Sequence, residues 1–135
     1  MIQQIHCRDL VIIHEMPNQF ISNAIVTADK ICRPLIQAKK LQPSDLRINV
    51  IEFKSFNSNG IYHQRISGFA SFDDMRSYRS WDFPWIQSDG PVIKSSLRQG
   101  SKHFRSDATK VIVLNVTAIP RLNGVLSQFK SNHHY

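Results

Sequence analysis

The chain has 135 residues, 41 % of them hydrophobic, and carries 17 Lys and Arg side chains against 10 Asp and Glu, for a net charge of +7. This length suits one domain with a single core, and the hydrophobic content excludes a disordered chain. Because no apolar run approaches about 20 residues, we expect no transmembrane segment and interpret residues 1–135 as one α+β domain.

The first part of the chain predicts a short buried strand at Leu10–His14 and then an amphipathic helix at about 19–40. Apolar residues recur in the helical stretch at spacings of three and four, which indicates a helix with one buried face. Pro34 lies inside this pattern, so we expect the helix either to kink there or to stop near Cys32 and restart.

A long β-hairpin is predicted at about 46–72. Asn59-Gly60 is a turn dipeptide, and the runs on either side of it are rich in β-branched and aromatic residues. A two-residue turn at this point would place Phe53 opposite Ile66 and so define the register of the pair. One face of the hairpin would then be apolar and would belong to the core.

The other face of the hairpin mixes charges with rings. We interpret it either as solvated or as a surface on which Phe69 stacks bases while Lys54 and Arg65 hold phosphates. The stretch 67–72 resembles, over six residues, the RNP1 sequence of RNA-recognition motifs, in which rings on an inner strand stack bases. That resemblance implies the same role for Phe69.

Three rings follow the hairpin. Asp73-Asp74 can cap a short helix that runs to Trp81, and Trp81, Phe83 and Trp85 then surround a proline, which excludes regular helix. Large rings in an irregular segment usually plug the edge of a core or fill a pocket on a partner. Both interpretations stay open from the sequence.

The last third of the chain carries almost all of the excess positive charge. Residues 92–135 hold seven basic side chains and one acidic, whereas residues 1–91 hold ten and nine. We interpret 92–107 as a basic loop able to follow a phosphate backbone. The run 110–116 is apolar on both faces, which predicts a central strand, and a final helix is predicted at about 120–130.

The predicted order of strand, helix, hairpin, short helix, strand and helix resembles the βαββαβ pattern of ferredoxin-like folds. The fold class is therefore α+β: a central hairpin in an antiparallel or mixed sheet, packed by an N-terminal and a C-terminal helix. The ferredoxin-like topology is one possible arrangement of these elements.

The charge distribution points to an anionic partner, RNA or DNA, and an anionic membrane or an acidic protein would satisfy it as well. The candidate nucleic-acid-binding residues are Lys54, Arg65, Phe69, Lys94, Arg98, Lys102, Phe104, Arg105 and Lys110. The candidate partner-binding residues are Trp81, Phe83 and Trp85.

No pattern in the sequence predicts a cofactor, a metal site or a small-molecule substrate. The two cysteines are far apart and form no CxxC pair, and the six histidines lack metal-ligand spacing. Glu52-Phe53-Lys54 resembles the E-x-K of one class of metal-dependent nucleases, in which a second acid helps to hold Mg²⁺. The nearest upstream acid, Asp45, lies at the other end of the same predicted strand.

From these observations we expect a non-enzymatic, basic nucleic-acid-binding protein, an RNA-binding subunit of a larger ribonucleoprotein or other assembly. The alternative is a protein–protein or membrane-surface assembly protein anchored by the Trp81–Trp85 rings, and a weaker alternative is a small metal-dependent nuclease. The cysteine usage and the absence of a secretory signal favour an intracellular, reducing compartment: cytoplasm, nucleus or organelle matrix.

Overall fold

The computed structural model describes residues 7–16, 24–39, 41–42, 45–54, 60–66, 68–78 and 83–116. The predicted helix at 120–130, the turn residue Asn59 and Trp81 lie outside these ranges. Within them the chain forms, in order, β1 (Arg8–Glu15), α1 (Ala24–Lys39), β2 (Leu46–Lys54), β3 (Ile61–Gln64), β4 (Ala70–Ser71), α2 (Phe72–Ser77), β5 (Ile86–Gln87), α3 (Val92–Gly100) and β6 (Thr109–Asn115).

The α+β class is confirmed, with a mixed six-stranded sheet and three helices in the described residues. The strand order is β5-β3-β2-β1-β6, and the short β4 also pairs with β2. Strand β1 runs parallel to both of its neighbours, β2 and β6, whereas β3 and β4 run antiparallel to β2. The ferredoxin-like topology is wrong, because its split β-α-β unit would insert a third strand between β1 and β2.

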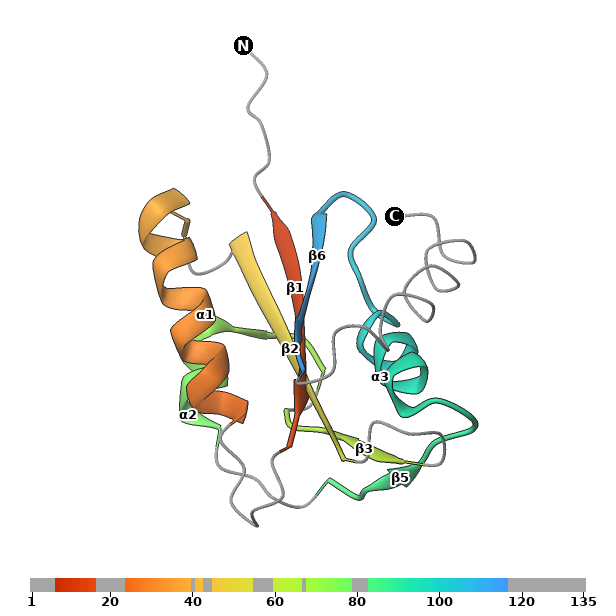
Figure 1. Ribbon diagram of the computed structural model, residues 1–135. Coiled ribbons are helices and arrows are strands. Elements are labelled where there is room, and N and C mark those ends of the chain that lie inside the picture. The colour runs from red at the N-terminus through yellow and green to blue at the C-terminus, as the bar shows by residue number, and fades with distance from the viewer. Residues whose placement is uncertain are drawn as a thin grey trace.

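Helices cover both faces of this sheet. Figure 1 shows α1 and α2 on one side and α3 on the other. Successive side chains of β1 therefore alternate between two cores: Leu10 and Ile12 pack toward α1, and Val11 and Ile13 pack toward α3. This arrangement explains why β1 is buried along almost its whole length and confirms the predicted N-terminal strand.

The predicted hairpin register is wrong. Phe53 pairs with Tyr62 and not with Ile66, which is a shift of four residues, and six residues separate the paired ends of β2 and β3. An even shift keeps each β3 side chain on its predicted face. The chain then leaves the ladder before rejoining β2 at Ala70, which pairs with Ile48. The prediction that one hairpin face is solvated also fails, because helices cover both faces.

Helix α1 and strand β6 each depart from one detail of the prediction. Helix α1 continues through Pro34, which is exposed, so the predicted stop near Cys32 does not occur. Strand β6 ends the strand order in the described part of the chain, and the central positions belong to β1 and β2. The apolar run of β6 is nevertheless consistent with its four half-buried inner residues.

The predicted basic loop at 92–107 begins as helix α3. Val92, Ile93, Ser96, Leu97 and Gly100 are buried at helical spacing against the sheet. Ser95 and Ser96, both buried, conceal this pattern in the sequence. The hydroxyl of Ser96 donates to the carbonyl of Val92 at 2.8 Å and can therefore be buried. The preceding helix, α2, is capped by Ser71, whose hydroxyl accepts from the backbone N–H of Asp74, and it ends at Ser77.

Gly100 lets α3 approach the sheet closely. A Cβ at this position would lie 2.5 Å from Cγ1 of Val11 and 3.4 Å from Cγ1 of Ile51. We expect Gly100→Ala to lower the free energy of unfolding by about 1–3 kcal/mol, because the methyl group overpacks the core. Chemical denaturation measures this loss. Gln99→Ala on the neighbouring position is the control and should change stability by less than about 0.5 kcal/mol.

Candidate nucleic-acid interface

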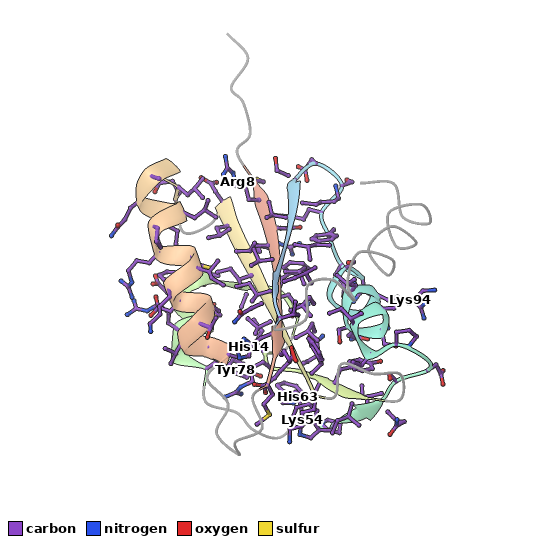
Figure 2. The ribbon with its side chains drawn as sticks, in the orientation of Figure 1. Arg8, His14, Lys54, His63, Tyr78 and Lys94 are labelled. Atoms are coloured by element: carbon purple, nitrogen blue, oxygen red, sulfur yellow. The ribbon has the colours of Figure 1, made fainter. Side chains whose placement is uncertain are left out.

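The outer side of α3 presents three cations. Lys94, Arg98 and Lys102 follow one another at intervals of four residues, on the helix and on the turn that ends it. Lys94 is half-buried, and Arg98 and Lys102 are exposed. Figure 2 shows Lys94 on the side of α3 that faces away from the sheet. No ion pair joins any of these three side chains to an acid within the described ranges. We call them the α3 cations.

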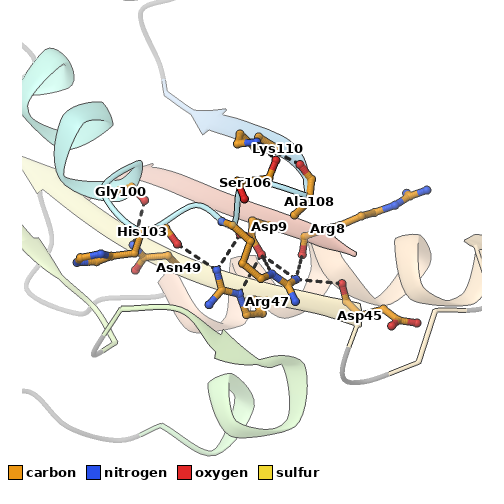
Figure 3. A network of polar contacts seen from close by, with 11 residues as sticks. Arg8, Asp9, Asp45, Arg47, Asn49, Gly100, His103, Ser106, Ala108 and Lys110 are labelled. Atoms are coloured by element: carbon orange, nitrogen blue, oxygen red, sulfur yellow. Dashed lines mark hydrogen bonds and ion pairs between the residues drawn. The ribbon is translucent and has the colours of Figure 1, made fainter. Parts of the chain in front are cut away.

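Arg105, by contrast, belongs to a buried polar network. Its backbone N–H donates to Oδ2 of Asp9 at 2.6 Å and its Nε to Oδ1 at 3.0 Å, while Arg47 donates to the same carboxylate at 2.9 and 2.8 Å. The Asp9 side chain is fully buried. Figure 3 shows how this carboxylate ties β1 to β2 and to the segment after α3. Arg105 is therefore committed to the fold.

The charge of Asp9 is favoured by these partners. Burial by itself would raise the pKa of this carboxyl, but the hydrogen bonds from Arg47 and Arg105 outweigh it and hold the pKa below its ordinary value. The same contacts raise the pKa of Arg47, chiefly through its hydrogen bond to Asp9. The Asp9 carboxylate is consequently charged at neutral pH and forms ion pairs with Arg47 and Arg105.

The two phenylalanines predicted to stack bases pack against the protein itself. The ring centroids of Phe69 and Phe104 are 5.7 Å apart, and both rings pack against the core beneath α3. The guanidinium of Arg47 lies 4.7 Å from the centroid of Phe69. Phe69 also lies just outside β4, so the position that the RNP1 resemblance implies on an inner strand is not reproduced.

Arg65 and Lys54 also lie away from the α3 cations. Arg65 is 3 % exposed and its backbone N–H donates to the carbonyl of Val50, so its side chain does not face an open surface. The ammonium of Lys54 lies 4.8 Å from the centroid of the Trp85 ring, at the far end of β2. Lys110 stays exposed on β6, with Nζ 3.3 Å from the carbonyl of Ala108.

A second cluster, which sequence reasoning missed, lies where β2 ends. Nε2 of His63 is 2.8 Å from Oε1 of Glu52, both side chains are buried, and the His63 ring stacks on Trp85 with centroids 3.8 Å apart. Figure 2 shows His63 and Lys54 close together at this end of the sheet. The observed register pairs Glu52 with His63. In the predicted register Glu52 and His63 are not opposite each other, so the sequence did not indicate this pair.

The Glu52–His63 cluster includes a residue of the predicted nuclease pattern and contacts one of the predicted partner-binding rings. The Glu52 carboxylate of the E-x-K pattern faces His63, and no group of three or more His, Cys, Asp or Glu in the described ranges could hold a metal ion. Of the partner-binding rings, Trp85 is engaged by His63, and Phe83 stacks on Tyr78 with centroids 6.0 Å apart. These two rings therefore make intramolecular contacts, as a core plug would.

The carboxyl ends of β1 and β6 are the other place where a ligand could be expected. Parallel strands end together there, and open α/β sheets often bind ligands in a crevice outside the carboxyl ends of their strands. Asn115 donates to Nδ1 of His14 at 2.8 Å across the two strand ends, and His14 is 4 % exposed. His14 and Asn115 therefore bond to each other, and we take the α3 cations as the candidate interface.

A cavity of about 290 Å³ adjoins the α3 cations. It opens between α3 and the β3–β5 pair and is lined by Tyr62, Ile86, Gln87, Asp89, Ser95, Arg98, Gln99 and Lys102. Two of the three α3 cations thus reach its lining.

Both cysteines are free thiols. Cys32 is fully buried on the side of α1 that faces the core. Burial, and to a smaller extent the nearby charge of Asp29, raises the pKa of its thiol to about 12. Such a thiol stays protonated and packs as a small apolar side chain. Cys7 is half-buried.

Comparison of the chain with protein-family models, curated proteins and solved structures finds no match to any of them. The described part of the chain also contains no helix that is both long and apolar enough to span a membrane. Function must therefore be argued from the site itself.

Proposed function

We propose that the protein is a non-enzymatic RNA-binding subunit of a larger assembly and that it docks on RNA through the α3 cations. The single observation that supports this proposal is the contrast between these three side chains and the other basic candidates. Lys94 and Arg98 project from α3 and Lys102 from the turn that follows it, with no acidic partner in the described ranges, whereas Arg105 and Arg65 are held inside the fold.

A row of cations along α3 and the turn that ends it suits a phosphate backbone. The four-residue spacing places Lys94 and Arg98 on neighbouring turns of one helix face, and Lys102 follows at the same spacing in the turn after Gly100. Each contact with a phosphate releases a condensed counterion, so that binding is driven by charge and depends weakly on sequence. The partner is then a polyanion whose charges repeat along a line.

Salt dependence tests this proposal. Three contacts on a single strand predict a slope of about −2 in a plot of log K against log salt, since each phosphate contributes about −0.7. We expect the affinity for a fluorescein-labelled single-stranded RNA decamer to fall by about 20-fold between 50 and 200 mM salt, measured by fluorescence anisotropy. A change of less than about threefold, or no binding at 50 mM salt, would contradict the proposal. Tighter binding of the matching DNA decamer would reassign the partner to DNA.

The assembly and nuclease interpretations receive less support from the geometry. Trp85 and Phe83 already make intramolecular ring contacts, and Glu52 is fully buried against His63. An anchor for a partner is expected to be exposed before binding, and a metal-binding carboxylate is expected to face a cavity that an ion and substrate can enter. We therefore make RNA binding our conclusion.

A further inference from the structure

The cavity beside α3 has a mainly polar lining that includes two cations, one aromatic ring and one aliphatic side chain. Tyr62 and Ile86 are register partners on β3 and β5, and Ile86, at 41 %, is one of two exposed large apolar side chains in the described ranges. Arg98 and Lys102 line the same cavity from the helical side. Asp89 is the one acid in the lining, so the two cations leave the cavity with net positive charge.

The size of the cavity restricts what could enter it. At about 290 Å³ it lies just below the roughly 300–1,000 Å³ of small-molecule sites. It therefore suits one planar ring system and not an extended ligand. A ring in the cavity could stack on Tyr62, and the two cations could hold a phosphate attached to that ring.

A nucleotide unit within a single strand meets each of these requirements. Its base is planar and apolar on both faces, its edges carry donors and acceptors, and its phosphate lies a few bonds away. The amides of Gln87 and Gln99 on the lining offer both donors and acceptors to the edge of such a base. A helical duplex, by contrast, keeps its bases stacked and has none to insert.

We propose that this cavity receives one unstacked base of the bound RNA, with the ring against Tyr62 and the adjoining phosphate on Arg98 and Lys102. This inference rests on the proposed function and adds the chemical class of the ligand, single-stranded RNA, to it. The α3 cations position the strand, and the cavity makes binding depend on the presence of a base.

Two probes of equal charge separate the base from the phosphates. One is a ten-residue oligouridine, and the other is a ten-residue abasic ribose-phosphate strand, both labelled with fluorescein for anisotropy. We expect the native protein to bind oligouridine about tenfold more tightly than the abasic strand, which corresponds to stacking of one base. Equal affinity for the two probes would overturn the cavity proposal and leave the proposed function standing. Failure to bind either probe would overturn both.

Two variants then assign the difference to the cavity. Tyr62→Leu should remove the preference for oligouridine, and Tyr62→Phe, the matched control, should keep it because the ring remains. Ser95→Leu should also remove the preference, since the larger side chain enters the cavity from α3. Affinity for the abasic strand should stay within about twofold in all three proteins and serves as the measure of correct folding. Retention of the preference in both Tyr62→Leu and Ser95→Leu would overturn the proposal.

Discussion

Charge reversal of all three α3 cations, Lys94→Glu, Arg98→Glu and Lys102→Glu, is expected to weaken RNA binding by at least about 100-fold at 100 mM salt. A hydrogen bond to a charged group contributes about 1.5–3 kcal/mol when well formed, and exposed contacts contribute less. Three exposed contacts together therefore amount to about 3 kcal/mol, which is slightly more than 100-fold. The new carboxylates would also repel the phosphates. Titration of the same RNA decamer measures the loss.

A matched pair of single variants removes the effect of net charge. Arg98→Glu and Lys30→Glu change the charge of the protein equally, and both residues are exposed on helices, one on α3 and the other on α1. Because α1 lies on the opposite face of the sheet, Lys30→Glu should weaken binding by no more than about twofold (Figure 1). Arg98→Glu should weaken it by about tenfold. Similar effects of the two variants would mean that the protein attracts RNA through its overall charge and has no interface on α3.

The second large effect is expected at Asp9, where the substitution Asp9→Asn should lower the free energy of unfolding by about 3 kcal/mol at pH 7. The carboxylate is fully buried and accepts from Arg47 and Arg105, so the amide would leave two guanidinium groups next to each other without a counter-charge. The contacts of this network join β1, β2 and the segment after α3 (Figure 3). Urea denaturation measures the loss, and Asp107→Asn, at an exposed position, is the control.

The pH dependence of this variant has a defined sign. The pKa of Asp9 is lower in the folded protein than in the unfolded chain, where it is about 3.9. The carboxylate therefore contributes its full stabilisation above about pH 4, and that contribution is lost as the pH falls through the folded pKa. The difference in stability between the native protein and Asp9→Asn should consequently be largest at neutral pH and should shrink in acid. A difference that stays constant from pH 7 to pH 3 would contradict the role of the charge.

Asp9→Asn and the triple α3 variant together distinguish effects on folding from effects on RNA binding. Asp9→Asn should keep its affinity for RNA at a temperature where it remains folded, because Asp9 does not belong to the α3 surface. The triple α3 variant should unfold at nearly the same urea concentration as the native protein. Loss of binding in folded Asp9→Asn would place the Asp9 network, with Arg105, in the interface after all.

Local patterns predicted several elements correctly. The unbroken apolar run of β1 indicates a short buried strand, and the structure confirms it. The three-and-four spacing correctly predicted α1 although the helix contains Pro34, because that proline lies on its exposed side. For α3 the same spacing was present but included serines, and it was interpreted as a loop. Its exposed cations could therefore be identified as residues, although the helix that aligns them could not.

The sequence by itself determined the α+β class, the positions of β1, α1, β2 and β6, and the concentration of positive charge in the last third of the chain. Each of these depends on residues close together in the chain. Tertiary structure decided which cations belong to the fold, because Asp9 meets Arg105 across 96 residues. Tertiary structure also decided the hairpin register. A six-residue connection does not fix how β2 and β3 align, so their alignment depends on how both faces of the sheet pack. Pairing over such distances depends on the complete core, and no short stretch of sequence encodes it.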